Sequence, residues 1–146
     1  MTKQAQFLLV DISLSEADCI SLQANIEALE QVFSDLDRWL QANAVADAFT
    51  PRLVLEELFV NIAHYSSATE PVVIYLHKQA NKLFLQIVDN GVAFNPLEQA
   101  AQPDLSLTAD QAPIGGLGVH MIKAMSTAQS YIYKNNYNHL CLQIDL

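Results

Sequence analysis

The sequence predicts an α+β fold, a two-layer sandwich in which a mixed, mostly antiparallel sheet carries helices on one face. Two observations lead to this prediction. The segments follow the order strand, helix, helix, strand, strand, loop, helix, strand, strand, and the later strands come as hairpin-connected pairs instead of alternating with helices. The chain has 146 residues, a length typical of one domain, so we expect residues 1–146 to form a single domain.

The N-terminal part of the chain is expected to contain a short strand and a long helix. Residues 7–13 are strand-like in composition. Ser15 and Asp18 resemble a capping box that opens a helix running to about Asn43. Apolar residues recur along this helix at alternating spacings of four and three, which makes one apolar stripe of Leu22, Ile26, Leu29, Phe33, Leu36 and Leu40.

A second helix is predicted to begin with Thr50 as its N-cap and Pro51 as its first helical residue, and to run to about Tyr65. Glu57 and Asn61 are four residues apart, so both lie on one face of this helix. A carboxylate there is a candidate general base, although a helical Glu is also commonly a solvated surface acid. The amide oxygen of Asn61 is a hard ligand suited to Mg²⁺.

The second half of the chain is predicted to form two hairpins with a short helix between them. The strands are recognised by β-branched and aromatic residues and by alternation of apolar with polar positions. They are residues 72–76, 83–88, 130–133 and 139–144, with turns at 79–81 and 134–138 and a helix from Gly118 to about Thr127.

A long loop is predicted between the first hairpin and the short helix. Residues 97–113 are polar and aperiodic, they are bounded or interrupted by prolines, and they contain no Lys or Arg. Long loops without regular structure are uncommon in compact domains and are often functional lids. We therefore expect residues 97–113 to form a lid.

All four glycines of the chain fall in two short stretches. Gly91 follows Asn90 after a predicted strand, and Gly115, Gly116 and Gly118 cluster where the short helix opens. Glycine lets a ligand approach the main chain closely, and a glycine cluster at a helix N-terminus can cradle a phosphate. The sequence therefore predicts a nucleotide site, although Asn90-Gly91 alone is an ordinary turn dipeptide.

Composition argues against two classes of partner. The formal net charge is −9 and Lys and Arg together number seven, whereas a nucleic-acid-binding surface needs clustered positive charge. No apolar run approaches the roughly 18 residues of a membrane span, and the N-terminus has no secretory signal. We expect a cytoplasmic protein that binds neither nucleic acid nor membrane.

Three stretches of the chain resemble the N box and the two glycine boxes of the GHKL (Bergerat-fold) ATPases and kinases. They are residues 50–65, 88–96 and 113–122. The resemblance, closest to the small anti-sigma-factor serine kinases, implies that the chain binds ATP and Mg²⁺. It implies that Glu57 is the catalytic base, that Asn61 binds the metal and the nucleotide, and that Asp89 accepts a hydrogen bond from the adenine amino group. The other nucleotide-binding residues that it implies are Gly91, Phe94, Gly115, Gly116, Leu117 and Gly118.

The function that this resemblance implies is partner switching. Such a serine/threonine kinase phosphorylates a serine of a STAS-type anti-anti-sigma protein and, when free, sequesters another partner such as a sigma factor; a homodimer is one expected assembly. The alternative is a nucleotide-dependent protein-binding regulator without phosphotransfer. The lid favours this alternative, because phosphoryl transfer depends on positive groups and the lid has none. The positive charge would then have to come from Mg²⁺, the helix N-terminus at residues 116–119 and Lys123, or from a partner. A histidine-kinase catalytic domain is disfavoured, because residues 1–49 contain no histidine.

Overall fold

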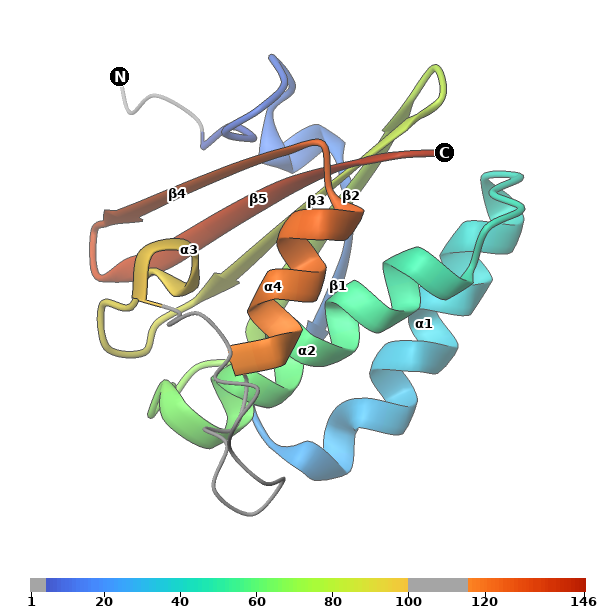
Figure 1. Cartoon of the computed structure of the whole chain (residues 1–146). Coiled ribbons are helices and arrows are strands. Elements are labelled where there is room, and N and C mark those ends of the chain that lie inside the picture. The colour runs from blue at the N-terminus through green and yellow to red at the C-terminus, as the bar shows by residue number, and fades with distance from the viewer. Residues whose placement is uncertain (1–4, 100–115) are drawn as a thin grey trace.

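A computed structural model describes residues 5–99 and 116–146 (Figure 1). One five-stranded sheet has the strand order β1-β2-β3-β5-β4. The strands are β1 (Asp18–Leu22), β2 (Val72–Gln79), β3 (Lys82–Asp89), β4 (Ala128–Lys134) and β5 (Tyr137–Asp145). The helices are α1 (Leu29–Ala42), α2 (Phe49–Tyr65), α3 (Pro96–Gln99) and α4 (Gly116–Met125), with 3₁₀ turns at Leu14–Glu16 and Ile26–Ala28. Within the described residues, no helix is long and apolar enough to cross a bilayer.

The predicted α+β architecture is confirmed. Helices α1, α2 and α4 lie on one face of the sheet, and the main apolar core fills the space between these two layers (Figure 1). Among the described residues all four strand pairings are antiparallel, whereas a mixed sheet was expected. The fully buried side chains of this core include Leu36, Leu40, Leu55, Phe59, Ile74, Leu76, Leu85, Leu142 and Ile144.

The prediction for residues 7–18 is wrong. Residues 7–13 form no strand and make one isolated bridge, between Gln6 and Ser13, while Asp18 opens strand β1 instead of a helix. The long helix begins only at Leu29, after a 3₁₀ turn whose cap is Asn25. Long-range pairing explains the difference, because residues 18–22 complete the backbone hydrogen bonds of β2 and place Ile20 in the core.

Residues 5–17, which we call the N-terminal segment, pack against the sheet face opposite the helices. Phe7 and Leu14 are buried there against Phe84 and Cys141 in a second apolar cluster. The fully buried Gln86 of β3 fixes the segment, since its Oε1 accepts from Leu8 N at 2.8 Å and its Nε2 donates to Gln6 O at 3.3 Å. The segment thus closes part of the second face of the sheet.

Helix α2 is confirmed, but its predicted cap is not. The helix begins at Phe49, and the side chain of Asp47 accepts hydrogen bonds from the backbone N–H groups of Phe49, at 3.1 Å, and Thr50, at 3.3 Å. Thr50 is therefore inside the helix instead of at its cap. An Asp before the first turn satisfies N–H groups that have no intrahelical partner.

Both predicted hairpins are confirmed, with longer strands than expected. Their connections are two-residue turns, in which Ala80 in the first and Asn135 and Asn136 in the second have positive φ. The second turn fits the preference of asparagine for this conformation. The predicted lid begins differently, because Leu97 belongs to the short helix α3; the rest of the lid from residue 100 lies outside the described residues.

Candidate functional site

The loop after β3 is locked onto the C-terminal end of α2. Val92 N donates to the carbonyl oxygen of Ser66, the C-cap of α2, at 2.8 Å. A Cβ atom added to Gly91 would lie 2.3 Å from Ser66 O and 2.5 Å from Ser66 Cβ, so only glycine fits at this position. The contact brings the predicted N-box helix and the first glycine box together.

Asp89 is the last residue of the central strand β3, and only 5% of it is exposed. Its Oδ1 accepts from Gly91 N at 2.8 Å and from Asn138 Nδ2 at 3.2 Å, while no described residue donates to its Oδ2. Burial raises the pKa of this carboxyl more than those two hydrogen bonds lower it. A buried carboxylate with one oxygen left over is suited to an amino-group donor of a ligand.

Asn138 is a site residue that the sequence analysis missed. It stands opposite Asp89 in the β3–β5 register and is 5% exposed. Its amide nitrogen also donates to Val92 O at 2.9 Å, and its oxygen accepts from Phe94 N at 3.0 Å and from the hydroxyl of Tyr131. No local motif could have revealed it, because its partners come from a strand pairing across more than forty residues.

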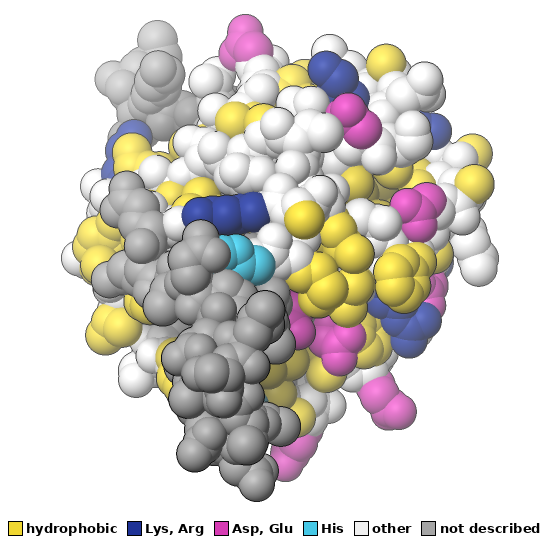
Figure 2. All heavy atoms as spheres, viewed as in Figure 1, with side chains coloured by type: hydrophobic (Ala, Val, Ile, Leu, Met, Phe, Trp, Pro, Cys, Tyr) yellow, Lys and Arg dark blue, Asp and Glu magenta, His cyan; other side chains and the backbone are white. Residues whose placement is uncertain are grey.

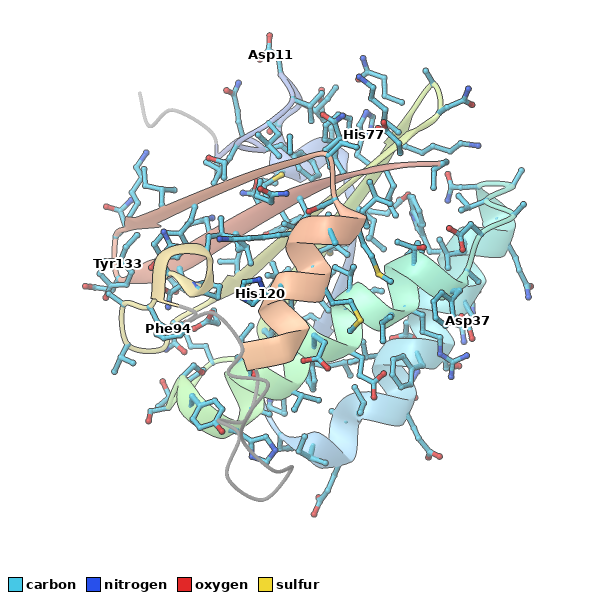
Figure 3. All side chains as sticks on the ribbon, in the orientation of Figure 1. Asp11, Asp37, His77, Phe94, His120 and Tyr133 are labelled. Atoms are coloured by element: carbon cyan, nitrogen blue, oxygen red, sulfur yellow. The ribbon has the colours of Figure 1, made fainter. Side chains whose placement is uncertain are left out.

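Asn90 and Phe94 complete the loop. The Asn90 side chain binds the segment that follows α2, where its oxygen accepts from the backbone N–H groups of Thr69, at 2.9 Å, and Glu70, at 3.0 Å. Phe94 is held through its backbone N–H, and the residue is 45% exposed (Figure 3). An exposed aromatic residue on the loop that follows Asp89 is compatible with a base-stacking role, which stays a prediction.

Glu57 and Asn61 lie half-buried on one face of α2. Neither side chain forms a hydrogen bond to another residue of the described part of the chain. Burial and, secondarily, the neighbouring Glu56 raise the pKa of Glu57, which makes its carboxylate a better proton acceptor than an exposed one. These groups are available for a metal ion and a substrate hydroxyl, as predicted, but their roles stay predictions.

Helix α4 begins at Gly116, so Gly116, Leu117 and Gly118 form its first turn. These backbone positions are those expected of a phosphate cradle, whereas Gly115 lies outside the described residues. The expected contribution of Lys123 to the phosphates receives no support, because its Nζ donates to Leu97 O at 2.6 Å and ties α4 to α3.

His120 is half-buried on α4, on the side that faces α3 and Phe94 (Figure 3). The same face drawn with all atoms shows a histidine and a basic side chain together over α4, and acidic side chains over α1 and α2 (Figure 2). The described surface over α4 therefore carries positive groups, and further Lys and Arg side chains lie elsewhere on this face.

Comparisons with known proteins identify the family to which the chain belongs. The sequence model of the histidine kinase-like ATPase domain matches residues 22–144. The chain is 33% identical over 113 residues to the serine/threonine-protein kinase BtrW of Bordetella bronchiseptica. This match covers 71% of this chain and 79% of BtrW. The fold of this chain resembles the Acinetobacter baumannii histidine kinase AdeS, with a TM-score of 0.52, 18% identity, and coverage of 89% of this chain and 68% of that chain. The chain belongs to the family of histidine kinase-like ATPase domains.

Proposed function

We propose that the chain is an ATP-binding serine/threonine protein kinase of the anti-sigma-factor type. It would phosphorylate a serine of a STAS-type anti-anti-sigma protein and, when free, sequester another partner such as a sigma factor. One observation carries the proposal: the Val92–Ser66 hydrogen bond joins the Asp89–Gly91 loop to the helix of Glu57 and Asn61. The similarity to a relative named as a serine/threonine-protein kinase supports the reaction class.

The residues present fit ATP. The free Oδ2 of Asp89 would accept from the 6-amino group of adenine, and the missing side chain at Gly91 would let the base lie against the backbone. Asn61 would hold Mg²⁺, whose other ligands would be phosphate oxygens and water. When bound, Mg²⁺ would neutralise charge that develops on the phosphates.

Glu57 would act on the protein substrate. Its carboxylate would take the proton of the serine hydroxyl while the serine oxygen forms a bond to the γ-phosphorus. The bond from that phosphorus to the bridging oxygen breaks, and ADP leaves with that oxygen. The raised pKa of Glu57 suits it to receive the proton.

A nucleotide-dependent binding module without phosphotransfer is the second candidate. Residues 97–113 contain no Lys or Arg, and Lys123 is engaged with a carbonyl oxygen. Phosphoryl transfer normally uses cationic groups around the terminal phosphate, so these observations favour binding without transfer.

The two candidates separate in one experiment, which uses radiolabelled ATP with Mg²⁺ and candidate STAS proteins. Glu57→Gln should keep nucleotide affinity but lower the rate of serine labelling by about 10²–10⁴, the usual contribution of a general base. Asn61→Ala should instead lose Mg²⁺-dependent binding, because it removes a metal ligand. Glu56→Gln, one residue away on another side of α2, is the matched control and should lower the labelling rate far less, because Glu56 is only the secondary cause of the raised pKa of Glu57.

If the unmutated chain binds ATP but labels no STAS protein, the binding module is the better conclusion. If Glu57→Gln labels at the normal rate, the kinase proposal stands and Glu57 is not its base.

A further inference from the structure

We propose that Asn138 is the positioning residue for base recognition, because its side-chain amide holds Asp89 and the 91–94 loop in their arrangement. The inference rests on the nucleotide site proposed above and adds a residue to it. Asn138 would not itself contact the base. It would act through Asp89, and its loss would remove the discrimination between purines.

Asn138 forms hydrogen bonds with Asp89 and with three residues of the 91–94 loop. Nδ2 donates to Asp89 Oδ1 at 3.2 Å, to Val92 O at 2.9 Å and, at the longer distance of 3.4 Å, to Gly91 O. Oδ1 accepts from Phe94 N at 3.0 Å and from the hydroxyl of Tyr131. One side chain that is 5% exposed thus fixes a carboxylate, two carbonyls and one N–H group.

The hydrogen-bonding capacity of this amide is fully used. Its two hydrogens are shared among three acceptors, and the two lone pairs of its oxygen face two donors. Exchanging the oxygen and nitrogen would turn the NH₂ group toward Phe94 N–H, which cannot accept, so the orientation is fixed. No donor or acceptor of Asn138 remains for a ligand, and its effect on recognition must pass through its partners.

The two carboxylate oxygens of Asp89 therefore have different roles. Gly91 N–H and Asn138 Nδ2 both bind Oδ1, so Oδ2 is the oxygen left to accept from a ligand. Without Asn138, the Val92 carbonyl and the Phe94 N–H lose their side-chain partner, and the carboxylate is free to turn. Unpaired groups of this kind are costly, so the loop is expected to rearrange.

The test compares ADP with IDP, both with Mg²⁺, by titration calorimetry. Adenine presents a 6-amino donor, while hypoxanthine presents an oxygen that would meet the Asp89 carboxylate. The unmutated chain should favour ADP by about 10-fold or more, as expected for a hydrogen bond to a charged group. Asn138→Ala should bring the two affinities close together, mainly by weakening ADP.

Four further variants make the result specific. Tyr131→Phe removes the hydroxyl that donates to Asn138 Oδ1. This variant should reduce the preference for ADP less than Asn138→Ala does. The double variant of Asp89→Asn with Asn138→Ala should discriminate no worse than Asp89→Asn alone, since both act on one contact. Ser126→Ala is the control, because Ser126 is also buried and hydrogen-bonded, to Ile122 O at 2.7 Å, but is not a hydrogen-bond partner of Asp89 or Asn138.

Ser126→Ala should lower the melting temperature and leave both affinities unchanged. If Asn138→Ala and Tyr131→Phe weaken ADP and IDP by equal factors, Asn138 has only a structural role and the inference is wrong. If Asn138→Ala does not fold, Tyr131→Phe and the control decide the question. If the unmutated chain binds neither nucleotide, the proposed function itself fails.

Discussion

Gly91 is the residue at which the site depends most on the absence of a side chain. In Gly91→Ala, the new Cβ would lie 2.3 Å from the backbone oxygen of Ser66, which cannot move without breaking its hydrogen bond to Val92 N. We expect a loss of unfolding free energy of about 1–3 kcal/mol, typical of overpacking, and weaker nucleotide binding.

Urea denaturation and calorimetry would measure the two effects. Val92→Ala is the matched control, because Val92 is 59% exposed and should change stability by no more than about 0.5 kcal/mol. Unchanged stability in Gly91→Ala would mean that the loop is not locked to α2.

The sequence predicted residues whose signals are local. Gly91 and Asp89 stand together after a strand, and Glu57 and Asn61 show helical spacing, so each could be found within a short window. Ser66 and Asn138 could not, because their importance comes from the docking of α2 on a loop and from the β3–β5 register. A polar residue in a strand does not reveal from sequence which group it will face.

At the scale of elements, the N-terminal segment depends on Gln86. Gln86→Leu keeps a similar volume but leaves Leu8 N and Gln6 O without their partner, which should destabilise the segment by about 1–3 kcal/mol. Cys141 lies fully buried in the cluster that the segment covers, and burial raises its pKa to about 12. Local opening would therefore be seen as faster modification of this thiol.

The measurement is the rate of thiol modification in a Cys19→Ser background, because Cys19 is exposed and would react first. We expect Gln86→Leu to accelerate Cys141 labelling by roughly 10-fold. Gln79→Leu, at the exposed end of β2, is the control and should not change the rate. Equal rates in both variants would show that Gln86 does not hold the segment.

The elements that the sequence predicted well are those with internal signals. Helix α2 and both hairpins follow from apolar periodicity and turn residues, and the structure alters only their ends. Strand β1 was mistaken for helix because Leu22, Ile26 and Leu29 happen to continue the apolar spacing of α1. Pairing with β2 outweighed that pattern, because it gives the backbone N–H and C=O groups of residues 18–22 hydrogen-bond partners on the neighbouring strand.

At the scale of the whole molecule, the charge of Asp89 is expected to favour ligand binding and to lower the stability of the ligand-free protein. Burial raises its folded pKa above the unfolded value, so protonation favours the folded state. As pH rises through the interval between these two pKa values, the stability due to Asp89 falls, and above the folded pKa the buried charge is a net cost. Asp89→Asn has no charge, and its oxygen can still accept from Gly91 N and Asn138 Nδ2.

We therefore expect nucleotide-free Asp89→Asn to be at least as stable as the unmutated chain at pH 7, and the difference in stability to shrink as the pH falls toward 4. Bound nucleotide should make the unmutated chain the more stable of the two. At a hundredfold excess over its dissociation constant, ADP with Mg²⁺ should stabilise the unmutated chain by about 2.7 kcal/mol, or roughly 5–10 °C, and the variant by much less. Thermal melts between pH 4 and 8, with and without nucleotide, measure both effects. If Asp89→Asn melts well below the unmutated chain at pH 7, Asp89 stabilises the fold. If the variant keeps the full shift with ADP, Asp89 does not bind the ligand.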